Sequence, residues 1–333
     1  MSKQRIALIG CGGIMNSHVN GLLTFEDIEI VAVADPLVER AQHMMGRTDA
    51  ARSYSCGKEL LEKEEKLDAV FICIEPTAHI GIEEACIERS IPFLVEKPMT
   101  LDMAQGKAIS EAATAKGLVT AVGFQDRYLD LTDRMHEELK DMRVGLVYAS
   151  WMGGVPGVWW WMKKDTCGGQ LYEQNIHLVD KLRYFFGEAE KVYATFGRGL
   201  VNPSELADTL PTYDTDDFST ATVTFKNGVV ANIMSACYIT NQGSGIRSGI
   251  TVIGRDKSFE YSLRDSLTIY SDGAVTKIPK KIDQMARLDR AFLDAVKAND
   301  PTAVRSPYSD AYKSLLLADA ANKSMATGQV VYL

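Results

Sequence analysis

The first 123 residues alternate short apolar runs with amphipathic stretches, and this alternation constrains the fold more than any other feature of the chain. The apolar runs are continuous rather than alternating in polarity, as expected for strands covered on both faces. Strands of this kind, each followed by a helical pattern, are typical of a parallel, doubly wound α/β sheet. We predict strands at 5–10, 28–35, 69–74, 92–96 and 118–123, and helices at 14–23, 38–45, 58–65, 78–88 and 101–116.

Length and charge limit the organisation and the partners of the chain. At 333 residues it exceeds what one hydrophobic core usually fills, so two domains are expected. The formal net charge of −8 argues against a nucleic acid or an anionic membrane as the main partner. The apolar run at the start is too short for a signal peptide or a membrane span, so we expect a cytoplasmic protein.

The cysteines do not indicate a metal site or a disulfide framework. No CxxC pair and no Cys/His cluster occurs among the six, which are Cys11, Cys56, Cys73, Cys86, Cys167 and Cys237. We therefore assign no metal-binding residues.

A glycine cluster, IGCGGIM, lies directly between the first strand and the first helix. Gly10 can make the tight turn there, and Gly12 lets the backbone approach a pyrophosphate. The amides at the start of the helix, near Gly13 and Ile14, can then point at the negative charge. The cluster therefore predicts a dinucleotide site, although glycine turns alone are common.

Three nearby residues refine this prediction. Met15 replaces the third glycine of the usual fingerprint, so we expect looser helix–strand packing or a tilted first helix. Asp35 ends the second strand, where an acid can bind both hydroxyls of the adenine ribose and repel a 2′-phosphate. NAD is therefore expected, and Arg40 keeps NADP as the less favoured alternative. The structural alternative is a glycine turn with a solvated aspartate.

Further motifs follow in a defined order. After IGCGGIM come ADP (34–36), IEPTAH (74–79), VEKPM (95–99), VGFQDRY (122–128) and GGQLYEQNIHLVD (168–180). Together they resemble the Gfo/Idh/MocA oxidoreductases, which include glucose–fructose oxidoreductase and inositol dehydrogenase. The resemblance spans most of the chain. It implies an NAD(P)-binding Rossmann domain at 1–123 and a C-terminal α/β domain with a large, mostly antiparallel sheet at 124–333.

Strand-like runs in the second half are compatible with such a sheet. Asn227 and Gly228 form the dipeptide favoured in type I′ hairpin turns. Helices are expected at 284–298 and 309–327, packed back on the first domain. The expected strands lie at 146–152, 191–197, 218–225, 229–239, 249–254, 267–271 and 330–333.

The resemblance implies that Lys97, Glu173 and His177 carry the chemistry. Lys97 follows the fifth strand, at the sheet edge where open α/β folds bind ligands, and resembles the family lysine that contacts the reacting hydroxyl. Glu173 and His177 are four residues apart in a helical pattern, which would place both on one face. His177 could take the proton of the hydroxyl while Glu173 orients it. The alternatives are an ion pair between Lys97 and Glu96, and a surface salt bridge or helix cap at Glu173 and His177.

Other residues are assigned more weakly. His79 could contact the cofactor or simply start a helix, and Gln125 and Arg127 could meet the nicotinamide and the substrate or link the domains. Glu96 would line the ribose or hold Lys97 in place, and a cis bond is expected before Pro98. The assigned cofactor contacts also include Ile74 and Pro76; Asn175 and Trp160 complete the substrate contacts.

Two segments depart from a simple pattern. The family often has Asp at position 173 and Gly at position 175, so Glu173 and Asn175 leave the substrate open. Trp159, Trp160 and Trp161 are consecutive, and three adjacent indoles cannot all point one way. We therefore expect at least one of them to be a core residue or a subunit contact.

These features predict an NAD(P)-dependent oxidoreductase that acts on a hydroxyl of a sugar, a cyclitol or a related polyol. Two alternatives stay open: glycoside cleavage through transient oxidation by a tightly held NAD, and a dinucleotide-binding protein without activity. The resemblance also implies a homo-oligomer, a dimer or a tetramer, packed through the C-terminal sheet.

Overall fold

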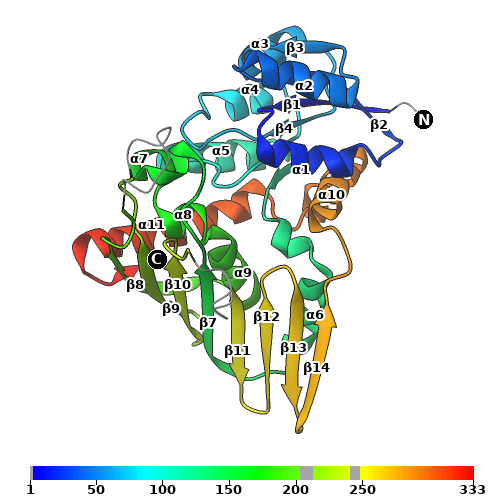
Figure 1. Ribbon diagram of the computed structural model, residues 1–333. Coiled ribbons are helices and arrows are strands. Elements are labelled where there is room, and N and C mark those ends of the chain that lie inside the picture. The colour runs from blue at the N-terminus through cyan, green and yellow to red at the C-terminus, as the bar shows by residue number, and fades with distance from the viewer. Residues whose placement is uncertain (1–2, 203–212, 241–247) are drawn as a thin grey trace. The chain divides into compact units, whose positions relative to one another are not determined.

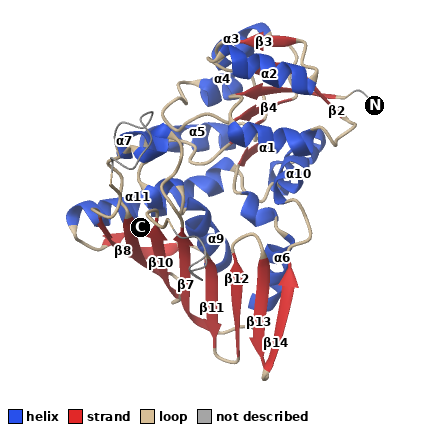
Figure 2. Ribbon diagram, in the orientation of Figure 1, coloured by secondary structure: helices blue, strands red, loops and turns tan. Residues whose placement is uncertain are grey.

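The computed structural model describes residues 3–202, 213–240 and 248–333 (Figures 1 and 2). The chain divides into two compact units. Unit 1 comprises Met1–Tyr128 and Asp283–Tyr312, and unit 2 comprises Leu129–Ile282 and Lys313–Leu333. The predicted parallel sheet lies in unit 1, and the predicted antiparallel sheet lies in unit 2.

The sheet of unit 1 is parallel throughout, in the order β3-β2-β1-β4-β5-β6. The order reverses between β1 and β4, which is where doubly wound sheets leave a crevice for a ligand. The short strand β3 was missed because its sequence, RSY, has no apolar run. The strands are β1 (Gln4–Ile9), β2 (Ile28–Ala34), β3 (Arg52–Tyr54), β4 (Ala69–Ile72), β5 (Phe93–Val95) and β6 (Thr120–Val122).

The helices of unit 1 follow the predicted pattern, with one late start. Helix α4 begins at Ile82 rather than at residue 78, after a turn that contains His79. Helix α10 returns to this unit, where Leu288 and Phe292 join the core beneath the sheet. The helices are α1 (Gly13–Leu22), α2 (Val38–Thr48), α3 (Gly57–Lys63), α4 (Ile82–Glu88), α5 (Met103–Ala115), η1 (Gln125–Tyr128), α10 (Gln284–Ala298) and η4 (Pro301–Ala303).

In the described residues the sheet of unit 2 has nine strands, in the order β14-β13-β12-β11-β7-β10-β9-β8-β15. Figure 2 shows the run from β14 through β11 and β7 to β10 of this sheet. Its pairings are antiparallel except between β7 and β10, so the mostly antiparallel sheet is confirmed. Strand β12 was missed because KSFEYS is largely polar, and β14 was missed because AVTKIP has no continuous apolar run and is mostly exposed. The strands are β7 (Val144–Met152), β8 (Ala189–Gly197), β9 (Phe218–Phe225), β10 (Val230–Ala236), β11 (Gly249–Gly254), β12 (Lys257–Ser262), β13 (Ser266–Ser271), β14 (Ala274–Pro279) and β15 (Val331–Tyr332).

The hairpin between β9 and β10 corrects the predicted turn type. In this loop Gly228 has a positive φ of 89°, whereas Asn227 does not. Gly228 donates its N–H to the carbonyl of Phe225, and Phe225 donates to Val229. This is a type I turn followed by a glycine bulge rather than a type I′ turn, because one extra residue separates the strands.

Helices of unit 2 cover one face of this sheet. Helix α9 packs against β7 and β10, and the Ser324 hydroxyl of α11 accepts the backbone N–H of Ala194 in β8. No helix in the described residues is long and apolar enough to cross a membrane. The helices are α6 (Asp130–Leu139), η2 (Trp159–Met162), α7 (Lys164–Cys167), α8 (Gln170–Glu173), α9 (Ile176–Phe186) and α11 (Tyr308–Thr327), whose first turn belongs to unit 1.

Candidate active site

The glycine loop after β1 is held by a close backbone contact. Gly10 has a φ of +84°, and a Cβ atom built there would lie 2.1 Å from the Cys73 carbonyl oxygen and 2.9 Å from Ile74 Cγ2. No side chain can therefore occupy position 10 without moving the segment after β4. This contact brings Ile74, a predicted cofactor residue, against the loop.

The next two glycines face open space at the start of α1. A Cβ atom at Gly12 or Gly13 would meet no atom within 4 Å. Gly12 is the N-cap residue and has no side-chain capping bond, and the first turn of α1 carries no acidic residue. Exposed amides with the positive end of a helix dipole and no competing carboxylate fit a pyrophosphate.

Asp35 binds the same loop from the end of β2. Its two carboxylate oxygens accept the N–H groups of Cys11 and Leu37, each at 2.8 Å. The side chain is buried, so the alternative of a solvated aspartate is wrong. Burial, together with the charge of Asp35, raises the pKa of the Cys11 thiol to about 12, so the loop cysteine stays neutral. Each oxygen of Asp35 keeps a lone pair for a ribose hydroxyl.

Replacing Asp35 by alanine is expected to weaken NAD binding by about tenfold and to reduce the preference for NAD over NADP. The substitution removes both a ribose acceptor and the charge that repels a 2′-phosphate. Isothermal titration with each dinucleotide measures both effects. Glu39→Ala, at an exposed position in α2, is the control, and an unchanged NAD affinity in Asp35→Ala would contradict the assignment.

Met15 is accommodated without visible disorder of the packing. Its side chain is fully buried and belongs to the hydrophobic core of unit 1. The longer side chain thus occupies core space that a glycine would leave empty, and the expected loosening or tilt of α1 stays a prediction.

Lys97 lies just beyond β5, at the carboxyl edge of the sheet in unit 1, and the Lys97–Pro98 bond is cis as predicted. Its side chain is half-buried. Its backbone N–H donates to Glu96 Oε2 at 3.1 Å, and Glu96 is itself buried. This contact supports the expectation that Glu96 holds Lys97. Two more predicted cofactor residues, Pro76 and Gln125, are buried in the same unit, while Arg40 is exposed on α2.

His79 is buried beside α4 and is oriented by Glu83, which contacts its Nδ1 atom. Gln105 donates to the backbone carbonyl of His79 at 2.9 Å. The Nε2 atom of His79 is buried and has no hydrogen-bond partner among the described protein atoms. The contact with Glu83 gives His79 a packing role, and its role toward the cofactor stays a prediction.

Arg127 takes part in a buried polar contact within unit 1. Its guanidinium donates to Asp310 Oδ2 and to the carbonyl of Arg305, both at 2.6 Å, and its side chain is 1% exposed. These partners all belong to unit 1, so the contacts are structural but do not link the domains, and a contact of Arg127 with the substrate stays a prediction.

The Arg127→Met variant is expected to lower the free energy of unfolding by about 1–2 kcal/mol, because it leaves two partly buried acceptors without their charged donor. Thermal and urea unfolding measure the loss. Arg5→Met, which removes a surface pair with Glu29, should cost less than about 1 kcal/mol. A raised substrate KM with unchanged stability would instead restore the substrate assignment.

Glu173 and His177 lie in unit 2, and both are buried, with 1% and 5% exposure. A surface salt bridge is therefore wrong. A single helix is also wrong: α8 ends at Glu173, and the N–H of Asn175 bonds to the carbonyl of Gln170, five residues back. Asn175 then starts α9. This wider turn changes the relative directions of the side chains before and after it, including those of Glu173 and His177.

Trp151 of β7 stacks on His177, with ring centroids 6.0 Å apart and an interplanar angle of 23°. The guanidinium of Arg264 lies 5.8 Å from the Trp151 ring centroid. Neither residue was predicted from the sequence. The position of Trp151 near the end of a predicted strand could have indicated it as a site residue. Its stacking partner, His177, is distant in the sequence, so the contact itself has no local signal.

Other predicted residues of unit 2 find structural partners. The buried Asn175 donates to the carbonyl of Met234 at 3.3 Å, and its Oδ1 atom has no partner among the described protein atoms. Trp160 stacks on Trp161 at 5.9 Å, and Trp159 is half exposed. None of the three tryptophans is a buried core residue. The other expectation, that at least one of them forms a subunit contact, stays a prediction.

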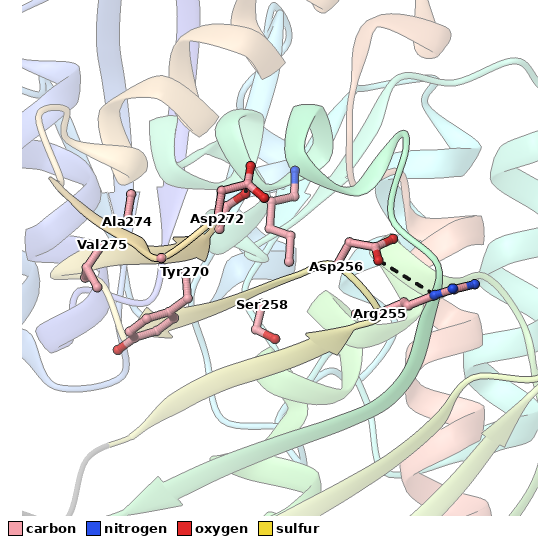
Figure 3. A pocket seen from close by; sticks show the side chains of 11 residues that line it. Arg255, Asp256, Ser258, Tyr270, Asp272, Ala274 and Val275 are labelled. Atoms are coloured by element: carbon pink, nitrogen blue, oxygen red, sulfur yellow. Dashed lines mark hydrogen bonds and ion pairs between the residues drawn. The ribbon is translucent and has the colours of Figure 1, made fainter.

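A shallow depression occurs at the turns of two hairpins of unit 2, β11–β12 and β13–β14 (Figure 3). An ion pair of 3.7 Å joins Arg255 and Asp256 at its rim. No predicted site residue lines it, and we assign it no role.

Comparisons with known proteins match segments of both units to one family. A family described as "Oxidoreductase family, NAD-binding Rossmann fold" matches residues 4–124, and the "GFO/IDH/MocA C-terminal domain" matches residues 143–260. The chain belongs to the Gfo/Idh/MocA oxidoreductase family. The resemblance seen in the motifs is thereby confirmed, and with it an NAD-binding Rossmann fold in an oxidoreductase.

Similar proteins cover the chain from end to end. It is 25% identical to myo-inositol 2-dehydrogenase of Thermotoga maritima, over 99% of this chain and 98% of that protein. It is 24% identical to inositol 2-dehydrogenase of Rhizobium meliloti, over 97% of each. A solved levoglucosan dehydrogenase, in complex with NADH and levoglucosan, superposes with a TM-score of 0.86 at 18% identity over 99% of both chains. That likeness shows the fold.

Proposed function

We propose that this oxidoreductase transfers a hydride between NAD and a hydroxyl-bearing carbon of a cyclitol or a sugar. The open glycine loop at the start of α1, with Asp35 bound to it, is the observation that carries the cofactor half of the proposal. The substrate half is supported by the relatives, which are named for inositol. Bound NAD would supply the acceptor for the hydride.

The protein residues then divide the work. Gly12 and Gly13 would hold the pyrophosphate and Asp35 the ribose. Lys97 would hydrogen-bond the reacting hydroxyl, and His177 would take its proton. Trp151 stacks on one face of the imidazole and would fix the plane of the ring. Lys97 belongs to unit 1 and His177 to unit 2, so their convergence on one substrate is part of the proposal.

Formation of NADH across a panel of inositols, sugars and linear polyols tests the proposal. We expect at least one cyclitol or sugar to be oxidised, with His177→Asn lowering kcat by about a hundredfold or more. Release of a glycosidic leaving group without NADH would favour the elimination alternative. Binding of NAD with no reaction on any substrate would contradict an enzymatic role.

We also propose that the sheet of unit 2 packs against a second copy of the chain. Register places alternate residues on opposite faces, and the helix-covered face is buried at Val147, Val252 and Phe259. Tyr148 lies on the other face. Successive pairings between neighbouring strands connect it to Tyr193 toward one edge of the sheet and to Thr268 toward the other, so these residues share that face. This face leaves large apolar side chains 38–65% exposed at Leu146, Tyr148, Tyr193, Ile253, Tyr270 and Val275.

Lysine at both Tyr148 and Tyr193 is expected to convert the oligomer to a monomer, because two charges would be buried without partners. Light scattering coupled to size exclusion measures the mass. Ile80→Lys, at a 71% exposed position in unit 1, is the control. A wild-type protein that is monomeric at micromolar concentration would refute the interface.

A further inference from the structure

A fully buried histidine contacts two carboxylates, one of which is that of Glu96, the residue before Lys97. His18 of α1 has no exposed surface; its Nδ1 atom is 2.7 Å from Asp289 Oδ1 in α10, and its Nε2 atom is 3.3 Å from Glu96 Oε1. All three residues belong to unit 1. They join three segments that are distant in sequence, and sequence analysis assigned no role to His18 or Asp289.

The geometry of the ring fits a positively charged imidazole. Both ring nitrogens face carboxylate oxygens, which accept hydrogen bonds when ionised. A neutral imidazole has one N–H, so one contact would then place two acceptors against each other unless an acid held the missing proton. An imidazolium satisfies both contacts, and it offsets one of two negative charges that are otherwise buried.

The same carboxylate reaches the backbone of Lys97. Glu96 Oε1 faces His18, and Oε2 accepts the N–H of Lys97. A Cβ atom at Gly123, beside the end of β6, would lie 2.1 Å from Glu96 Oε1, so the slot exists only because position 123 lacks a side chain. The Glu96 carboxylate is therefore fixed from three sides.

We propose that His18 is a positively charged positioning residue that holds Glu96 and, through Glu96, the backbone of Lys97. The inference deepens the proposed function, because it rests on Lys97 as the residue that contacts the reacting hydroxyl. Helix α1 also carries the glycine loop at its first turn. His18 thus ties the helix that would hold the cofactor to the strand end that carries the lysine.

The electrostatic surroundings agree with this geometry. Burial opposes a charge on His18, but the interactions with Asp289 and Cys73 outweigh it and hold the pKa of the imidazole well above its ordinary value of 6.5. The other titratable groups that face the pair are Glu96, Cys73 after β4, and Asp283 near Asp289. Since the pKa is raised in the folded protein, the stabilisation is complete below pH 6.5 and is lost as pH rises through the folded-state value.

Nitrogen NMR of histidine-labelled protein tests the charge directly. The chain has five histidines, and the His18 signal is the one that disappears in His18→Gln. We expect protons on both ring nitrogens of His18 at pH 7 and their loss only in the alkaline range. A neutral ring at pH 7 would overturn the proposal.

Kinetics test the positioning role. His18→Gln is expected to lower kcat by about tenfold or more with KM for NAD within about twofold, and to shift the Lys97 amide resonance. His43→Gln, at an exposed position in α2, is the matched control. Wild-type kcat and an unmoved Lys97 amide in a folded His18→Gln protein would refute the role.

If His18→Gln does not fold, Asp289→Asn provides a second test of the proposal. It keeps the shape of the side chain but removes the charge at Nδ1, so His18 should lose its proton at lower pH and kcat should fall. If neither changes, the proposal is wrong. Failure of the proposed function can be distinguished from failure of this proposal. If the proposed function is wrong, Lys97→Met keeps wild-type activity, while the NMR measurement of the charge on His18 gives the same result as before.

Discussion

Replacing Lys97 by methionine is expected to lower kcat for oxidation of the best cyclitol or sugar substrate by about a hundredfold to ten-thousandfold. Methionine keeps the length and the apolar stem of the side chain but removes every hydrogen-bond donor. The backbone N–H of Lys97, which donates to Glu96, is unaffected, so the end of β5 should keep its conformation. NAD affinity should change by less than about threefold, because Lys97 is a predicted catalytic and substrate residue and not one of the predicted nucleotide contacts.

Stopped-flow and steady-state measurements of NADH formation give kcat, and fluorescence titration gives the affinity for NAD. Lys107→Met is the matched control, since that lysine is exposed on α5 and pairs with Glu111 at 3.7 Å. A Lys97→Met enzyme with wild-type kcat would remove Lys97 from the reaction. A variant with normal kcat but a raised KM would make it a binding residue instead.

The Gly10→Ala variant is expected to lose about 3 kcal/mol or more of unfolding free energy and, with it, NAD binding. The φ of +84° is unfavourable for alanine, and the new Cβ would overlap the Cys73 carbonyl oxygen, a backbone atom that cannot rotate away. Chemical unfolding and calorimetric titration measure the two losses.

The Gly12→Ala variant separates folding from binding at the same loop. Its Cβ meets no atom within 4 Å, so stability should stay within about 0.5 kcal/mol of the wild type. The methyl group would nevertheless occupy the space proposed for the pyrophosphate and should weaken NAD binding by about tenfold or more. Unaltered NAD binding in Gly12→Ala would place the cofactor elsewhere.

Local sequence signals predicted most of the elements of unit 1. The continuous apolar runs gave five of its strands, and the glycine loop and Asp35 were correctly placed around the first β–α connection. The failures have local causes. A strand with the sequence RSY, at the sheet edge, has no apolar run, and α4 starts only at Ile82 because its N-cap, Gly81, has a φ of 72°, which is not helical.

Residue spacing misled in unit 2 for a different reason. Glu173 and His177 have the spacing of one helical face, but the bond from Asn175 to the carbonyl of Gln170 widens the turn between them. Burial of both side chains rather than exposure also depends on the sheet and helices around them. Periodicity reports which residues could share a face, whereas packing decides whether the helix continues.

The sequence by itself determined the fold class and the position of the glycine loop after the first strand, because short-range patterns specify them; the reactive side chains stay a proposal. Only the tertiary structure placed Trp151 against His177 and joined His18, Glu96 and Asp289. These contacts link residues far apart in the chain. The sequence around His18 shows only a helix residue, and its two carboxylate partners are identified only by the fold. Their energies arise from burial, where charges and rings lose water and must find partners, and burial exists only in the folded protein.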